Sequence, residues 1–430
     1  MRPVRITICT ADVGCGHTRA ALAIMQALRE RAANADITLV EALDDAPAWF
    51  NLIYREGYLT LVRHAPRVAG MINSVTDKPQ RGSRGDEGLE RPQKVRLCMG
   101  DAIEARAVRA LLANPAVLNA DVIICTHFLC ARVLGNARAA GKLSTPLLTC
   151  VTDQHPHAVW LAGACDRLLV ASPAAAATAI KAGVSPLRII ASGIPIDPRF
   201  SDVAGATNRD AARRELHVPQ GSRMALLSGG GLGLGGIETA FEAILGSGRS
   251  VHATVVCGRS VKLHARCSEI ARRHTGPATA EVVGFTNKMP QYMAAADVLV
   301  GKPGGLTTAE AAASGLAMVL MNPIPGQEER NAAQLVGAGA ARVCATARSA
   351  GLTAAQLLGD ETTLTHMRAC ARSVGRLDAA YVAAEAVLTL LSPTLEKAAR
   401  GERSDQPPVP VACVLDEPGV QALGCVSGGA

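Results

Sequence analysis

The sequence has few aromatic residues and no long hydrophobic run. Phe, Trp and Tyr together make up 3% of the 430 residues, which leaves little for stacking on nucleic-acid bases. No Lys/Arg-rich run is interleaved with aromatics, and no stretch of about 18 uninterrupted apolar residues is present to cross a bilayer. We therefore expect no nucleic-acid partner, and only peripheral contact with any membrane.

The cysteines lack the spacing of a zinc site or of a disulfide framework. There are 13, an odd number, and no two are spaced C-x-x-C, which favours reduced thiols and a cytoplasmic location. Residues 1–5 contain no apolar signal core. No D-x-D motif is present to hold a divalent cation, so we expect no cofactor and no strictly required metal ion.

Short apolar runs alternate with Ala-rich segments of helical period along the chain. Arg5–Cys9 precedes a predicted helix over about residues 18–33 and a second run at Ile37–Val40, and the alternation resumes at residues 225–227 and 298–300. Near-continuous apolar strands separated by helices indicate parallel sheets covered on both faces. The length suits two such sheets and two domains.

Composition places the boundary between the domains within residues 193–221, where Gly, Pro and polar residues gather. We predict an N-terminal domain over residues 1–200 and a C-terminal domain over residues 201–375. A helix over residues 376–400 would cross back to the first domain, and residues 401–430 would form a disordered tail. Residues 76–96, rich in charge and glycine, predict a surface loop.

The first glycine motif, Asp12–Thr18, follows the first predicted strand and opens a helix. Glycine lets the backbone approach a ligand, and a helix N-terminus offers N–H groups to oxyanions. A dinucleotide-binding loop is the alternative, with Glu41 in the place of its ribose-binding acid, but Arg19 stands where its third glycine belongs. His17 is suited either to general-base chemistry near neutral pH or to capping the helix.

A second glycine cluster, residues 228–236, also follows a strand and precedes a helix that begins near Ile237. So many glycines imply close contact between the backbone and a ligand, and a diphosphate suits the helix terminus. A flexible hinge is the other interpretation.

The third constellation is the most specific and covers residues 284–331. Residues 302–308 combine glycines, hydroxyls and the cation Lys302, as an anion site requires. Glu310, one turn into the next helix, suits the two hydroxyls of a ribose, although an acid there also favours the helix dipole. Gln327 and Glu328 open a further helix and are placed to read sugar hydroxyls.

Aromatic residues concentrate in one segment of the first half. Trp49, Phe50, Tyr54 and Tyr58 are four of the chain's 11 aromatics, and the last three recur every four residues. The segment is either a core-facing helix or an interfacial helix that enters a bilayer. Residues 1–200 carry 23 Lys and Arg against 17 Asp and Glu, whereas the rest carries 21 against 20, and a basic half attracts anionic lipid.

The order of these motifs resembles that of the GT-B glycosyltransferases that include MurG. More closely, it is similar to the monogalactosyldiacylglycerol synthases and the processive diacylglycerol glycosyltransferases. Residues 152–157 look like the acceptor-side motif of that group, and residues 193–200 look like its interdomain signature. The sequence Pro-Gly-Gln-Glu at residues 325–328 also matches a motif of that group. The resemblance covers about residues 1–395 and implies an α/β fold of GT-B architecture, with two Rossmann-like domains facing across a cleft.

The resemblance also implies roles for individual residues. His17 would be the catalytic base or would orient the acceptor, and Asp12 beside it would be the second catalytic residue. Cys15 replaces a glycine of the family's loop. The hexose would lie on Gln327 and Glu328. UDP would be held by Gly229, Gly230, Gly258, Arg259, Phe285, Lys302, Gly304, Gly305, Thr307, Thr308 and Glu310. The acceptor and the membrane would contact Trp49, Phe50, Tyr54, Tyr58, His155 and His157.

The function implied is an inverting transfer of galactose or glucose from a UDP-hexose to diacylglycerol at an anionic membrane surface, on the inner face of the cell membrane. One alternative is a MurG-like transfer of N-acetylglucosamine to a polyprenyl-linked acceptor. Two others are a non-catalytic nucleotide-sugar-binding protein and a dinucleotide-dependent oxidoreductase.

Overall fold

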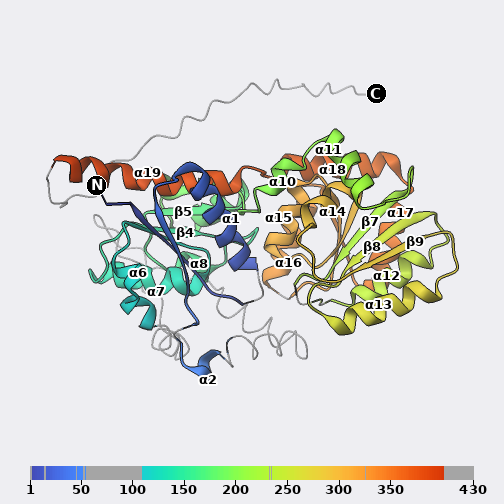
Figure 1. Ribbon diagram of the computed structural model, residues 1–430, viewed down its shortest axis with the longest axis horizontal. Helices are drawn as coiled ribbons and strands as arrows, with labels where there is room; N and C mark the ends of the chain where they lie inside the picture. The colour runs from blue at the N-terminus through green and yellow to red at the C-terminus, as the bar shows by residue number, and fades with distance from the viewer. Residues whose placement is uncertain are drawn as a thin grey trace, which may run out of the picture.

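The structure is a computed structural model that describes residues 2–13, 16–44, 46–51, 54, 109–231, 233, 235–324 and 326–400. Gly14, Cys15, Tyr58, the predicted surface loop at residues 76–96 and the tail from residue 401 lie outside these residues. Figure 1 shows the described chain as two α/β halves that lie side by side along the long axis of the molecule.

The first half is built on a six-stranded parallel sheet with strand order β2-β1-β3-β4-β5-β6. Its strands are β1 (Arg5–Thr10), β2 (Asp36–Glu41), β3 (Val122–Cys125), β4 (Leu147–Cys150), β5 (Arg167–Val170) and β6 (Ile189–Ala191). Its helices are α1 (Gly16–Arg31), α2 (Ala48–Asn51), α6 (Pro115–Leu118), α7 (Phe128–Ala139), α8 (Ala158–Leu161) and α9 (Pro173–Lys181), with 3₁₀ turns at Arg109–Ala113 and Pro186–Arg188.

The second half repeats this plan, with a six-stranded parallel sheet of order β12-β11-β10-β7-β8-β9. Its strands are β7 (Arg223–Ser228), β8 (Val251–Val256), β9 (Thr279–Val283), β10 (Val298–Gly301), β11 (Ala317–Met321) and β12 (Ala341–Cys344). Its helices are α12 (Ile237–Leu245), α13 (Val261–Arg273), α14 (Met289–Ala295), α15 (Gly305–Ala313), α16 (Gln327–Gly337), α17 (Ala347–Leu357) and α18 (Glu361–Val374). Helices α10 (Arg199–Asp202) and α11 (Ala206–Glu215) connect the halves.

Apolar side chains on both faces of the central strands hold each sheet between its helices. All four residues of β3 and all four of β10 are buried, as expected of parallel strands covered by helices on both sides. The edge strand β2 alternates between exposed and partly buried residues over most of its length. The two parallel sheets confirm the predicted fold class.

The last helix of the described chain, α19 (Ala379–Arg400), returns to the first half. In Figure 1 it runs along the upper edge of the N-terminal half, beside α1. Ala380, Ala384 and Val387 are fully buried in the core cluster that also contains Ile6 and Ile8 of β1. The chain therefore passes from the first half to the second and back. The domain limits set at residues 200 and 375 stay predictions.

Candidate functional site

The predicted motifs leave both sheets at the points where the strand order reverses. In the first sheet this point lies between β1 and β3, and in the second between β7 and β10. His17 follows β1, Gly229 follows β7, and Gly304 follows β10. Open α/β sheets bind ligands in the crevice at such a switch point, outside the carboxyl ends of the strands. The fold thus directs both switch points to one interface, where α1 contacts α15.

His17 lies at the start of α1 and is held through one ring nitrogen. Its Nδ1 lies 2.7 Å from Oγ1 of Thr152 and 3.1 Å from the carbonyl oxygen of Thr126. Burial lowers the pKa of His17, and the carboxylates of Asp153 and Asp12 raise it in part. The imidazole is therefore neutral at pH 7, the state that a general base requires. Asp12 also accepts a hydrogen bond of 3.5 Å from Thr18 Oγ1.

Aromatic rings surround His17 on the side of the first half. The ring centroid of His127 lies 4.4 Å from that of His17, and the centroid of Trp160 lies 6.0 Å away. Phe128 packs on His127 with centroids 4.2 Å apart. Burial holds the pKa of His127 well below its usual range, and its Nδ1 accepts a hydrogen bond from the backbone N–H of Leu129. His127 is thus a neutral ring whose Nε2 carries the proton.

Asp153 joins the two halves beside this group. Both of its carboxylate oxygens accept hydrogen bonds of 2.9 Å from Nε2 of Gln327, at the start of α16. Trp160 Nε1 donates to it at 3.0 Å, and Asn331 Nδ2 donates at 3.3 Å. The carboxylate is buried, and these donors replace the water that it loses. Gln327, predicted to hold the hexose, therefore contacts the opposite half in this structure.

Glu310 is the second predicted donor residue that faces across the interface. It is buried in α15, and its Oε1 lies 2.7 Å from an Nη of Arg19 in α1. Burial raises the pKa of Glu310 to about 7, although the guanidinium of Arg19 acts in the opposite direction. The carboxyl group therefore changes its charge within the physiological pH range.

The predicted anion loop is shorter than the sequence suggests. Helix α15 begins at Gly305, so the connection that follows β10 ends at Gly304, and Thr307 and Thr308 belong to the helix. Thr308 Oγ1 donates to the carbonyl oxygen of Gly304 at 2.9 Å. The first N–H groups of a helix have no partner within the helix. An anion in this connection would meet the terminus of α15 rather than an extended glycine loop.

Lys302 and Glu328 form an ion pair within the second half. The Nζ and Oε2 atoms are 3.1 Å apart, and both side chains are largely buried. The same carboxylate accepts a hydrogen bond of 2.7 Å from the backbone N–H of Ile324. Burial raises the pKa of Glu328, against the effect of Lys302. Glu328 thus holds the loop before α16 and forms an ion pair with Lys302.

The glycines after β7 and β8 bring two connections close together. Gly258 has a φ of +58°, and a Cβ there would lie 3.0 Å from the carbonyl oxygens of Gly230 and Gly231, so only glycine fits without strain. The guanidinium of Arg259 lies 5.2 Å from the ring centroid of Phe285. Phe285 is 59% exposed. Gly229, another residue predicted to hold UDP, follows directly after β7.

The residues predicted to contact the acceptor and the membrane do not form one exposed face. Phe50 is buried in a core cluster and stacks on the partly buried Tyr54, with centroids 5.0 Å apart. Trp49 is 53% exposed. His157 lies near Phe128 and Trp160, whereas the backbone N–H of His155 donates to Asn331 at 3.2 Å. The aromatic segment therefore contributes both to the core and to the surface.

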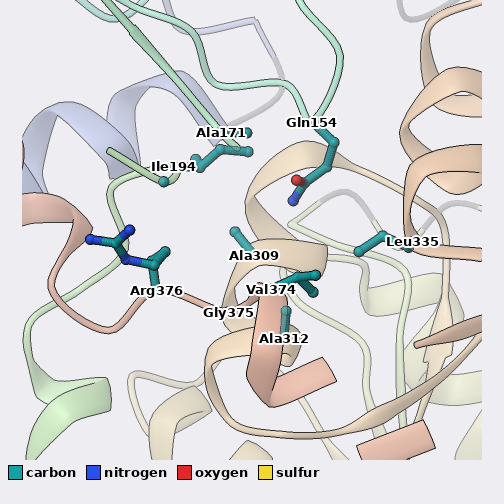
Figure 2. A pocket seen from close by; sticks show the side chains of 10 residues that line it. Gln154, Ala171, Ile194, Ala309, Ala312, Leu335, Val374, Gly375 and Arg376 are labelled. Atoms are coloured by element: carbon teal, nitrogen blue, oxygen red, sulfur yellow. The ribbon is translucent and has the colours of Figure 1, made fainter. Parts of the chain in front are cut away.

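A small pocket lies between the two halves, beside Gln154 (Figure 2). Gln154 Nε2 lies 3.4 Å from Thr308 Oγ1, across the two halves. Figure 2 shows Ala309 and Ala312 of α15 on one side of this space and Ala171 and Ile194 of the first half on another. Its walls combine apolar side chains with the polar groups of Gln154 and Arg376.

Sequence reasoning assigned no individual site role to several residues at the interface, although Thr152 and Asp153 belong to the predicted acceptor-side motif. All of them lie just after strands or near the starts of helices. Their positions directly after predicted strands could have indicated them, because the carboxyl ends of neighbouring parallel strands meet at one edge of a sheet. These residues are Arg19, Thr126, His127, Phe128, Thr152, Asp153 and Asn331.

The described ranges contain neither a metal-binding cluster nor a membrane-spanning helix. Within residues 2–400, apart from the gaps named above, no group of three or more His, Cys, Asp and Glu side chains is arranged to hold a metal ion. No helix in the same part of the chain has both the length and the apolar character needed to span a bilayer.

Two parallel α/β halves joined at their switch points define the GT-B architecture. MurG from Acinetobacter baumannii has this fold, with a TM-score of 0.57 at 17% identity over 90% of this chain and 99% of that protein. The family model for monogalactosyldiacylglycerol (MGDG) synthase matches residues 17–196. The model for the glycosyltransferase family 28 C-terminal domain matches residues 237–363.

Named relatives agree with these matches. The chain is 28% identical to the chloroplastic monogalactosyldiacylglycerol synthase of Spinacia oleracea, over 83% of this chain and 66% of the relative. It is 28% identical to a processive diacylglycerol beta-glucosyltransferase of Staphylococcus epidermidis, over 53% of this chain and 56% of the relative. It thus spans just under two thirds of the first relative and little more than half of the second. The first half of the chain is thus similar to MGDG synthases, the second half to the glycosyltransferase family 28 C-terminal domain, and the fold is that of MurG.

Proposed function

We propose that the protein is an inverting glycosyltransferase that moves a hexose from a UDP-sugar to diacylglycerol. The observation that carries the proposal is the neutral imidazole of His17, which lies at the interface where α1 meets the N-terminal end of α15. A base on one half and an anion-binding helix terminus on the other are what a single displacement between two substrates requires.

In the proposed reaction the second half holds the UDP-hexose and the first half presents the acceptor. His17 takes the proton from the acceptor hydroxyl while that oxygen attacks the anomeric carbon. The bond from this carbon to the diphosphate oxygen breaks, and UDP leaves with the bonding electron pair. The terminus of α15 and Arg259 would offset the charge that develops on UDP. One displacement inverts the configuration at the anomeric carbon.

Glu310 and Gln327 would have to exchange partners when the donor binds. In the structure Glu310 lies against Arg19, and Gln327 donates to Asp153. Ribose hydroxyls would replace Arg19 at Glu310, and hexose hydroxyls would compete with Asp153 for Gln327. Both contacts cross the interface, so donor binding and the relative position of the two halves would be linked.

A lipid acceptor is supported by the family relationship and by surface features of the first half. The exposed ring of Trp49 lies in that half, which also carries most of the excess positive charge. A tryptophan at the surface of a basic domain suits the headgroup region of an anionic bilayer. We therefore place the protein at the inner face of the cell membrane as a peripheral protein.

The test is transfer of radiolabelled sugar from UDP-galactose and UDP-glucose to diacylglycerol in anionic vesicles. We expect label in the lipid phase, reduced by about 10² to 10⁴-fold in His17→Ala and strongly reduced in Glu310→Ala. The exposed His366 offers a matched control, and His366→Ala should retain activity. Measurable UDP binding without transfer from either donor would refute the diacylglycerol assignment. Transfer of N-acetylglucosamine to a polyprenyl-linked acceptor would replace it.

A further inference from the structure

The two partners of His17 Nδ1 constrain where the ring carries its proton. The carbonyl oxygen of Thr126, 3.1 Å away, can only accept a hydrogen bond. The hydroxyl of Thr152, 2.7 Å away, can accept or donate. An unprotonated Nδ1 would place its lone pair against the carbonyl oxygen, which is unfavourable. Both contacts are satisfied together only when Nδ1 carries the proton.

Nε2 of His17 is the nitrogen that remains available. No residue that the structure describes forms a hydrogen bond with it. The His17 residue as a whole is only partly buried. With the proton on Nδ1, the lone pair of the neutral ring lies on Nε2.

Thr152 is fixed from two directions. Its side chain is buried, and its backbone carbonyl faces the first residue of α15 so closely that a Cβ on Gly305 would lie 2.0 Å from the carbonyl oxygen. One residue therefore touches the imidazole through its hydroxyl and the second half through its backbone. The backbone that carries this hydroxyl is therefore held where the two halves meet.

We propose that Thr152 is a positioning residue for His17, which together with the Thr126 carbonyl keeps the proton on Nδ1 and leaves Nε2 as the basic nitrogen. The inference rests on the proposed function, in which His17 takes a proton from the acceptor. When the acceptor O–H bond breaks, the proton goes to Nε2 and the ring becomes an imidazolium. The Nδ1–H group still donates to Thr152, and a charged donor makes a stronger hydrogen bond than a neutral one.

Other groups also act on the charge of His17, and the test must separate them from Thr152. The Asp153 and Asp12 carboxylates favour the imidazolium, and a positive charge on His157 disfavours it. The charge of His17 likewise acts on His127. Substitutions at Thr152 alter none of these four titratable groups.

The experiment compares Thr152→Val, which keeps the shape but loses the hydroxyl, with Thr152→Ser, which keeps the hydroxyl. In Thr152→Val we expect kcat for sugar transfer to fall about tenfold while the affinity for UDP is unchanged. The acid limb of kcat/KM should move to lower pH, because the imidazolium loses a hydrogen bond that favours it. Thr152→Ser should restore both values to near those of the wild type. Wild-type kcat in Thr152→Val would overturn the proposal.

A second measurement does not depend on sugar transfer. The ¹⁵N NMR signals of the imidazole of His17, assigned by their loss in His17→Ala, report which ring nitrogen is protonated in the unmodified protein. We expect the tautomer with the proton on Nδ1 above the pKa of His17. A proton on Nε2 would overturn the proposal even if transfer is fast. If neither UDP-sugar supports transfer, the proposed function fails. The NMR result still shows independently whether the proton of His17 lies on Nδ1.

Discussion

Two helices that begin with glycine meet at the interface, and only in one of them is there no space for a larger residue at that position. Helix α1 begins at Gly16 and α15 at Gly305, each after a strand at a switch point. A Cβ on Gly305 would lie 2.0 Å from the Thr152 carbonyl oxygen, whereas the nearest described atom to a Cβ on Gly16 is Cβ of Leu306, at 3.9 Å. The backbone of α15 therefore sits directly on the first half, and that of α1 leaves room for a side chain.

The first turns of the two helices also differ in chemistry. Helix α1 carries His17 and Arg19 in its first turn, whereas α15 carries Thr307 and Thr308 and has its acid, Glu310, further along. The positive end of a helix dipole disfavours cations and favours anions. The terminus of α15 is therefore the better place for a diphosphate, and α1 is better suited to supply a base.

The largest effect should come from Gly305→Ala, because the new methyl group must displace the Thr152 backbone. We expect kcat/KM to fall by about 100-fold, since a shift of about 1 Å in a reacting group has effects of that size. Overpacking should also lower the free energy of unfolding by about 1–3 kcal/mol. Transfer assays and urea titration measure the two quantities.

Gly337→Ala, at the end of α16, is the control for this change. No described atom lies within 4 Å of a Cβ at Gly337, so alanine should fit. We expect nearly wild-type kcat/KM for this variant. Equal activity in Gly305→Ala would mean that transfer does not require the contact between α15 and Thr152.

A smaller effect, about tenfold, is expected for UDP affinity in Glu310→Gln. The pKa of Glu310 is raised to about 7, so wild-type affinity should rise with pH through about 7, as the carboxylate forms and accepts from the ribose. Glutamine should give a lower affinity that does not depend on pH in this range. Calorimetry from pH 5.5 to pH 8.5 tests this, and an unchanged pH dependence in the variant would exclude Glu310 as its source.

The ionisation of Glu310 should also make the free energy of unfolding depend on pH. A carboxyl whose pKa is raised by folding binds more protons in the folded chain than in the unfolded chain. The free energy of unfolding should therefore fall as the pH rises from about 4.5 to about 7. Glu310→Gln should remove this contribution without affecting that of the buried His17 and His127. Their lowered pKa values destabilise the fold as the pH falls below about 6.5.

The fold was predictable because its signals are local. The apolar run at residues 298–300 lies in the buried strand Val298–Gly301, and the helix predicted over residues 18–33 spans Gly16–Arg31. Burial on both faces of a parallel sheet leaves an apolar run that any window of the sequence shows. The start of α15 was missed because two glycines and two threonines are weak helix signals.

The candidate site was predictable only as a set of separate motifs. His17, Glu310 and Gln327 were assigned individual roles, whereas Thr152 and Asp153 were placed only within the acceptor-side motif and Arg19 received no site role. These pairs join residues that are far apart in the chain, and their contacts depend on how the two sheets dock. No local pattern encodes that docking. The roles of the predicted donor and acceptor residues stay predictions.

A modest change is expected for Arg19→Met, which removes the cation beside Glu310. The pKa of Glu310 should rise further, because Arg19 opposes the effect of burial. The pH at which the affinity for UDP rises should then be higher. At pH 7 the affinity should be lower by up to about fivefold, as expected for the loss of a partly exposed ion pair. Arg19→Lys keeps the charge and should retain the wild-type midpoint. A stronger affinity at pH 7 in Arg19→Met would instead show that Arg19 competes with the ribose.

The smallest effect is expected for Gly16→Ala. The described chain leaves space for the methyl group, so the free energy of unfolding should rise by about 0.4–1 kcal/mol through the lower entropy of the unfolded chain. Transfer should stay within about twofold of the wild type if the base acts through the side chain of His17 alone. A large loss of transfer with unchanged UDP affinity would mean that the acceptor approaches the α1 backbone as closely as Thr152 approaches Gly305. Both glycines would then serve close contact, one with the opposite half and one with the substrate.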